Sequence, residues 1–148
     1  MVQSAKEKKT RSEARIAALQ MLYILEQNPD ASIMGIIESA KDTDEIVISS
    51  PEVRDFTKEL AQAVLGHKEA IDALLSKYTK NWSIERLSSI DRNVLRLGVA
   101  ELQGDFNTPV RVVINEVVEL AKKFGTDDSA KFVNGVIDAV KEEIDYTK

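Results

Sequence analysis

An almost unbroken run of apolar residues stands out near the start of the chain. Nearly every position between 16 and 25 is apolar, so a helix over this run is expected to be buried on several sides. Capping-box patterns at 4–7 and at 10–13 each offer a start for that helix. Proline cannot continue a helix, so Pro29 predicts an end at about Asn28.

Beyond this run, apolar residues recur every three or four positions, which is the spacing of amphipathic helices. Residues 42–50 are acidic and are expected to form a loop. The stretch over 51–78 is consistent with one long helix or with two helices that break at Gly66. Other helical segments are expected at about 32–41, 89–103, 110–124 and from 127 onward, with a short turn over 83–87.

Two stretches carry signals for strands or turns that the helical spacing overrules. Residues 110–114 are mostly β-branched and would suit a strand, but apolar positions continue at helical spacing from Val113 to Phe124. Asn134 and Gly135 resemble a hairpin turn, yet no alternating strands flank them. We therefore expect Gly135 to allow close packing inside the last helix, and we predict an all-α chain of six or seven helices.

The helix over 89–103 is predicted to have two distinct faces. On an ideal wheel of about 100° per residue, its apolar residues share a broad arc. Arg92 and Arg96 lie opposite that arc, one turn apart. Asp91 borders the arc in the first turn, where an acidic side chain stabilises the helix dipole or presents a charge to a protein partner.

Composition narrows the chemistry that the chain can perform. There is no cysteine and only one histidine, His67, which excludes thiolate and multi-histidine metal sites. The glycines are isolated, so no phosphate-binding loop is present. No apolar run is long enough to span a bilayer, which takes about 20 residues. We expect a cytoplasmic, non-enzymatic protein with no metal or cofactor and no membrane contact.

Charge is distributed unevenly along the chain, whose formal net charge is −5. Residues 1–15 hold five basic and two acidic side chains, whereas residues 26–59 hold nine acidic and three basic ones. The basic segment is either a solvated tail or a segment that contacts phosphates. In the last helix, Phe132 lies at the edge of the apolar stripe beside Lys131, where it would stack on an unpaired base or pack against a neighbouring helix.

Several motifs, in matching order, resemble the NusB family of bacterial transcription antitermination factors. They are WSIERLSSIDRNVLRL at 82–97, VINEVVELAKKFG at 113–125 and KFVNGVID at 131–138. The resemblance is strong from about 70 to 140, weaker from 10 to 28 and faint through 30–50. It implies one NusB-like domain over 1–148, with two small helical bundles that share the first long helix. The implied parts are a basic arm at 1–10 and subdomains at about 10–80 and 81–148.

The resemblance also implies a function and a set of partners. Members bind boxA, a single-stranded element of ribosomal-RNA leader transcripts, together with NusE, a small-subunit ribosomal protein. The heterodimer joins other Nus factors in an antitermination complex on RNA polymerase, and no catalysis or cofactor is implied. The sequence leaves homodimerisation open.

When the family's functional positions are transferred to this sequence, the resemblance implies two sets of binding residues. Those expected to contact RNA are Lys6, Lys8, Lys9, Arg11, Arg15, Asp128, Lys131 and Phe132. Tyr23 and Asp91 are expected to face NusE, and Arg92 to serve either surface. Family N-termini are often rich in arginine, whereas lysine dominates here and lacks the bidentate fork of arginine. We therefore expect weak RNA binding by the chain alone.

Two other functions fit parts of the sequence. The acidic net charge is consistent with a helical protein-interaction adaptor that makes no RNA contacts of its own. NusB-like domains also accompany ribosomal-RNA cytosine methyltransferases as accessory RNA-binding domains. The chain contains no catalytic domain or cofactor-binding loop, so this last class requires that it be a piece of a longer protein.

Overall fold

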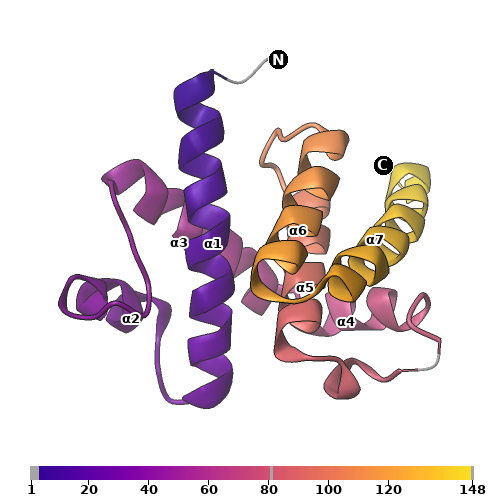
Figure 1. The fold of residues 1–148 in the computed structure, drawn as a ribbon, viewed down its shortest axis with the longest axis horizontal. Coiled ribbons are helices and arrows are strands. Elements are labelled where there is room, and N and C mark those ends of the chain that lie inside the picture. Colours follow the sequence, from indigo (N-terminus) through magenta and orange to yellow (C-terminus); the bar gives the residue numbers. More distant parts are fainter. Residues whose placement is uncertain (1–3, 81, 148) are drawn as a thin grey trace. The chain divides into compact units, whose positions relative to one another are not determined.

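The computed structural model describes residues 4–80 and 82–147, and these ranges contain seven α-helices, two short 3₁₀-helices and no strand. The all-α prediction is therefore confirmed, including the helix over the β-branched residues 110–114. In chain order (Figure 1) the elements are α1 (Ala5–Gln27), α2 (Ile33–Ser39), η1 (Ala40–Asp42), α3 (Pro51–Gly66), α4 (Lys68–Ser76), η2 (Ile84–Arg86), α5 (Ser89–Gln103), α6 (Val110–Phe124) and α7 (Asp127–Thr147).

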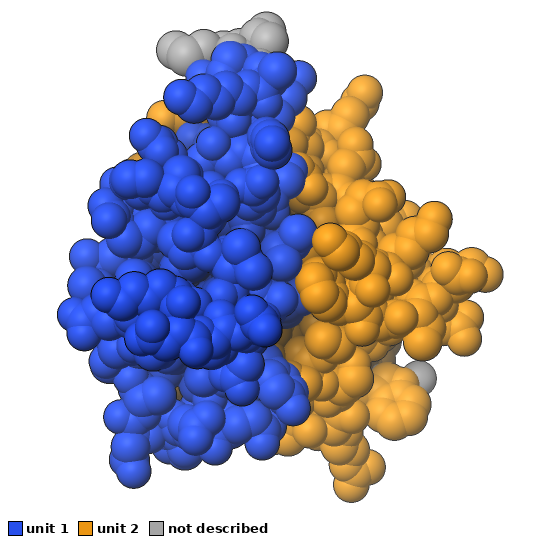
Figure 2. All heavy atoms as spheres, turned by 60° about the vertical axis from the view of Figure 1, so that its left-hand side comes forward, with its two compact units in different colours: residues 1–62 blue, residues 63–148 orange. Residues whose placement is uncertain are grey.

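The chain divides into two compact units, Met1–Gln62 and Ala63–Lys148 (Figure 2). The division falls inside α3, whereas the sequence placed the boundary between subdomains at about residue 80. One continuous helix over 51–78 is not found, because α3 ends at Gly66 and α4 begins at Lys68. The alternative of two helices that break at Gly66 is confirmed.

In the first unit, α1 begins at the earlier of its two candidate caps. The Glu7 amide donates to Ser4 Oγ at 3.1 Å, and Glu7 Oε1 accepts from the Ser4 amide at 3.5 Å. This reciprocal pair satisfies two donors that the first helical turn leaves open. Residues 5–10 of the predicted basic arm are therefore helical, and residues 1–3 lie outside the described residues.

An aliphatic cluster forms the core of the first unit. It joins α1, α2, η1, α3 and the loop between η1 and α3 through Ala17, Met21, Ile36, Ala40, Ile46 and Ala61. Ile46 is almost fully buried although it lies in the acidic loop. The loop is therefore anchored by one apolar side chain while its acidic residues stay exposed.

In the second unit, α5, α6 and α7 pack against one another, and α4 packs against α5 (Figure 1). The polar face expected on α5 is not solvated, because every residue from Asn93 to Leu102 is buried. Arg96 is only 6% exposed. Its Nε and Nη2 donate to the two carboxylate oxygens of Asp72 on α4, each at 2.8 Å. Thus α4 covers the face of α5 that carries Arg96.

Close packing between helices occurs at a glycine other than the expected one. A Cβ placed on Gly135 would have no atom within 4 Å, so the prediction that Gly135 allows close packing is wrong. A Cβ on Gly98 of α5 would lie 3.0 Å from Ile137 Cδ1 and 3.2 Å from Val117 Cγ1. Gly98 therefore allows α5 to approach α6 and α7, whereas Gly135 faces solvent because it lies away from the buried stripe of α7.

Side-chain hydrogen bonds connect α7 to the two residues that follow α4. Tyr78 Oη donates to Glu143 Oε1 at 2.7 Å, and Lys77 Nζ lies 3.1 Å from Glu143 Oε2. The hydrogen bond from Tyr78, aided by Lys77, lowers the pKa of Glu143 below its ordinary value. The same bond to the carboxylate raises the pKa of Tyr78.

This network predicts a loss of stability in acid. Because the pKa of Glu143 is lower in the folded than in the unfolded state, its contribution is complete above the unfolded value of about 4.3. The contribution disappears as pH falls through the folded value. We expect thermal unfolding of Glu143→Gln to vary less between pH 5 and pH 3 than that of the unchanged protein. Parallel pH profiles of the two proteins would contradict this role for Glu143.

Candidate nucleic-acid interface

The first part of the candidate site is the N-terminal half of α1. Lys6, Lys8 and Lys9 are exposed, whereas Arg11 is partly buried. Arg15 is only 2% exposed, and its guanidinium lies 5.9 Å from the centre of the Phe56 ring. The five cations of α1 that were predicted to contact RNA therefore differ in their access to a ligand.

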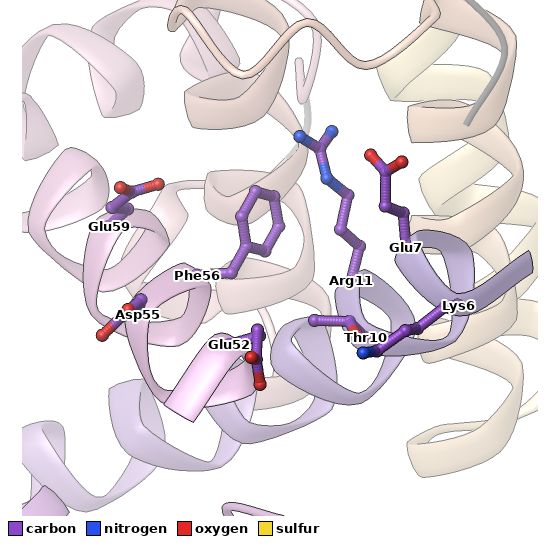
Figure 3. A pocket seen from close by; sticks show the side chains of 8 residues that line it. All are labelled: Lys6, Glu7, Thr10, Arg11, Glu52, Asp55, Phe56 and Glu59. Carbon is purple, nitrogen blue, oxygen red and sulfur yellow. The ribbon is translucent and has the colours of Figure 1, made fainter. Parts of the chain in front are cut away.

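Arg11 is held against an aromatic ring of α3. Its guanidinium carbon lies 4.7 Å from the centre of the Phe56 ring, which is within the range of a cation–π interaction. Figure 3 shows the two side chains, which project from α1 and α3 and meet in the space between these helices. The Arg11 side chain thus helps to fix α1 on α3.

Three acidic residues of α3 accompany this contact. A pocket of about 460 Å³ is lined by Lys6, Glu7, Thr10 and Arg11 from α1 and by Glu52, Asp55, Phe56 and Glu59 from α3 (Figure 3). The three carboxylates line the same pocket as the two cations, so they offset part of the positive charge there. On an ideal helix, Lys8 and Lys9 lie about 130° to either side of the centre of the four α1 residues that line this pocket, so both point away from it.

The second part of the candidate site lies in the other unit, near the start of α7. Asp128 and Lys131 are exposed, and Phe132 is partly buried. Phe132 lines an open pocket of about 200 Å³ together with Trp82, Arg86, Leu87, Ser88 and Asp91. Phe132 was predicted to contact RNA and Asp91 to contact a protein, but the fold places both in one pocket.

The carboxylate of Asp91 is not used in the cap of its own helix. The Asp91 amide donates to Ser88 Oγ at 3.1 Å, which is half of a capping box. The carboxylate does not complete the box, and Asp91 Oδ1 is buried with no hydrogen-bond partner among the described residues. Stabilisation of the helix dipole therefore accounts for the charge of Asp91 but not for this oxygen.

Arg92 has a structural partner in the same region. Its Nη1 donates to the backbone carbonyl of Leu87 at 2.8 Å and lies 3.5 Å from that of Ile84. These bonds connect α5 to the turn formed by η2. Contact of Arg92 with RNA or a protein stays a prediction.

Each unit has an exposed aromatic side chain. Tyr23 on α1 is 47% exposed although it lies within the apolar run, so it is available to a partner. Trp82, the one tryptophan of the chain, is 56% exposed. The sequence contains Trp82 in the motif at 82–97 but assigns it no contact. Only its place with Phe132 in the lining of one pocket indicates a functional role.

The described residues contain neither a metal-binding cluster nor a membrane-spanning helix. No group of three or more histidine, cysteine or acidic side chains in this part of the chain could hold a metal ion. In the same residues, no helix has the length and apolar character needed to cross a membrane.

An exposed cationic helix face and an aromatic pocket on an all-helical scaffold are features of nucleic-acid-binding proteins. The particular family follows from comparison with known proteins. The chain belongs to the NusB family, whose model matches residues 12–142.

Relatives and solved structures match nearly the whole chain. A transcription antitermination protein NusB of Myxococcus xanthus is 40% identical over 130 residues, which are 88% of this chain and 93% of that protein. NusB of T. maritima is 34% identical, with a TM-score of 0.79, over 90% of this chain and 91% of its own. A crystal structure of antitermination factors NusB and NusE in complex with double-stranded RNA contains a chain that is 30% identical. That match has a TM-score of 0.79 and covers 91% of this chain and 98% of the other.

Proposed function

We propose that this chain is a transcription antitermination factor that binds boxA-type single-stranded RNA of ribosomal-RNA leader transcripts. It acts as a heterodimer with NusE and joins other Nus factors in an antitermination complex on RNA polymerase. The observation that carries the proposal is the match over 91% of the chain to a protein that was crystallised with NusE and double-stranded RNA. The single-stranded boxA element is what the resemblance to the family implies.

The structure supports different roles for the candidate residues of α1. Lys8 and Lys9 are exposed and lie away from the acidic residues of α3, so they are the strongest candidates for phosphate contacts. Lys6 and Arg11 add positive charge beside the pocket. Arg15 is buried against Phe56, and we assign it a role in positioning α1.

On the protein side of the proposal, Tyr23 is the candidate contact with NusE. An exposed tyrosine offers a large apolar ring and a polar hydroxyl, which is why this residue type is enriched at interfaces. Its position on the same helix as the lysines allows one element to serve both partners.

Fluorescence anisotropy with a labelled boxA RNA and a scrambled RNA tests the function directly. We expect preference for boxA to rise when NusE is added, because Lys8 and Lys9 alone make few phosphate contacts. Equal affinity for both RNAs, with and without NusE, would contradict recognition of boxA. Absence of binding to either RNA would favour an adaptor that makes no RNA contact.

The lysine face of α1 leads to a quantitative prediction. Changing Lys8 and Lys9 to alanine is expected to weaken RNA binding and to flatten the dependence of log K on log salt. The slope should change by up to about 1.4, because each lost contact with a single strand contributes roughly 0.7. Titrations at several salt concentrations measure the slope.

Lys122 and Lys123 provide a matched control. They are also adjacent, exposed and helical, but they lie in the last turn of α6. Their replacement by alanine removes the same charge and should leave the salt slope unchanged. Equal effects of the two double substitutions would mean that RNA senses only the total charge of the chain.

A further inference from the structure

The segment between η1 and α3 alternates between buried and exposed residues. Ile46 is 2% exposed, and Ile48 is partly buried against the same aliphatic cluster. Val47, between them, is 68% exposed, and Ser49 is exposed as well. A period of two is typical of a strand with one face on a core. Figure 1 shows that the chain passes from η1 to α3 without a helical turn, so residues 46–49 form a single extended segment.

The backbone of this segment makes no hydrogen bonds. Within the described part of the chain, the amide and carbonyl groups of Val47, Ile48 and Ser49 have no partner. A row of unpaired backbone groups is a template for another strand. Proteins usually protect such edges with proline or charged side chains, but residues 46–50 contain neither. The exposed residues 47–49 therefore form an unprotected edge.

The segment is held in place from both ends. Thr43 Oγ1 accepts from the Glu45 amide at 2.8 Å. Ser49 Oγ donates to Glu13 Oε2 of α1 at 2.8 Å. A pair of strands alone is only marginally stable in water, but here one strand is already fixed on the core of its unit. A second strand would lose only its own conformational freedom on binding.

A pocket beside the edge can take apolar side chains. Its volume is about 470 Å³, and it is lined by side chains of α2 and η1, by residues 46–48 and by Arg54 of α3. The charged residues of its lining are Lys41, Arg54 and Glu38, two cations and one acid. This excess of positive charge disfavours a basic side chain inside the pocket, whereas the isoleucine and valine side chains favour an apolar one.

The surface around the edge is acidic. From residue 38 to residue 55 the chain has six acidic and two basic side chains. Asp42, Asp44 and Glu45 are exposed, and their carboxylates form no ion pair within the described ranges. Such a field attracts a basic partner and speeds its association. It disfavours a second copy of this chain, whose net charge is also negative.

We propose that residues 47–49 are a docking edge for an extended, basic segment of another protein, which adds as a β-strand. The backbone groups of Val47 and Ser49, which point to the same side of an extended chain, pair with this segment. One of its apolar side chains enters the pocket, and its basic residues lie beside Asp44 and Glu45. None of these residues is expected to contact RNA or NusE, so the proposal adds a protein contact to the proposed function.

A synthetic peptide tests the docking edge. The probe is Lys-Lys-Val-Thr-Val-Lys-Lys with both ends blocked, because it has alternating apolar residues and basic residues for either strand direction. It is titrated into the isotopically labelled full chain while NMR follows the amide signals. We expect the largest shifts, and slower hydrogen exchange, at the amides of Val47 and Ser49. The acidic peptide Glu-Glu-Val-Thr-Val-Glu-Glu should bind roughly ten-fold more weakly.

Proline at position 47 separates backbone pairing from a side-chain contact. Val47→Pro removes the N–H but remains compatible with an extended chain. It should weaken binding of the basic peptide about ten-fold, the effect of losing one or two hydrogen bonds. Val47→Thr keeps the N–H and the branched shape and should bind nearly as well as the unchanged protein. Thermal unfolding verifies that both variants are folded.

The acidic residues are tested by a matched pair of double variants. Asp44→Asn with Glu45→Gln should weaken binding of the basic peptide and reduce its dependence on salt. Glu69→Gln with Glu119→Gln removes the same charge from exposed positions on α4 and α6 and should leave binding unchanged. Equal effects of the two pairs, or equal binding of the acidic and basic peptides, would overturn the basic character of the partner.

The remaining outcomes decide what uses the edge. Absence of binding of the basic peptide, or shifts confined to other residues, would overturn the docking edge and leave the RNA-binding function intact, because boxA binding is measured separately. Equal binding by Val47→Pro would overturn the pairing of strands. Dimerisation of the unchanged chain in sedimentation experiments, abolished by Val47→Pro, would assign the edge to a second copy instead.

Discussion

Replacing Asp72 by alanine is expected to lower the free energy of unfolding by roughly 3 kcal/mol, the lower end of the range for breaking a buried ion pair. The substitution removes both hydrogen bonds that Arg96 donates to the carboxylate. The Arg96 side chain is only 7% exposed, so water cannot replace those bonds at low cost. The Asp72 side chain is 26% exposed, which is why we expect the lower end.

Chemical denaturation monitored by circular dichroism measures this effect. Glu69→Ala is a suitable control, because Glu69 is an exposed acid on the same helix and should contribute only about 0.3–1 kcal/mol through the helix dipole. Similar losses in the two variants would mean that the pairing of Asp72 with Arg96 contributes little beyond its charge.

Replacing Gly98 by valine is expected to destabilise the protein by about 1–3 kcal/mol, the typical cost of overfilling a packed interior. The first added carbon would already lie 3.0 Å from Ile137 and 3.2 Å from Val117. The two additional methyl groups of valine would force α6 or α7 away from α5. Unfolding by denaturant gives the change in stability.

Gly135→Ala is the matching substitution at a glycine whose surroundings leave room for a side chain. No atom lies within 4 Å of its added carbon, and alanine favours the helix by roughly 0.5–1 kcal/mol relative to glycine. We therefore expect Gly135→Ala to stabilise the protein. A destabilised Gly135→Ala, or an unchanged Gly98→Val, would contradict the packing described for α5 and α7.

Local signals in the sequence predict the helices well. The cap at Ser4, Pro29 after α1 and the apolar spacing through α6 act within a few residues, so a linear reading detects them. The environment of Arg96 is different, because its polarity suggests a solvated face and only the position of Asp72 on α4 reveals its burial. The close approach at Gly98 likewise depends on side chains from α6 and α7.

The candidate site shows the same limit. Phe132 and Asp91 could each be singled out in the sequence, because an aromatic residue and an acid at the edges of apolar stripes are unusual. Their meeting in one pocket with Trp82 and Arg86 could not, since these residues come from three separate segments of the chain. The buried state of Arg15 also depends on Phe56, which is distant in sequence.

The capping box at the start of α1 has a consequence for the entropy of binding. Because Ser4 and Glu7 close the first turn, Lys6, Lys8 and Lys9 already occupy fixed backbone positions before any ligand arrives. A disordered basic tail would lose about 1–2 kcal/mol of backbone freedom for each residue ordered on binding. In this chain that loss is incurred during folding, so more of the attraction between lysines and phosphates is retained as affinity.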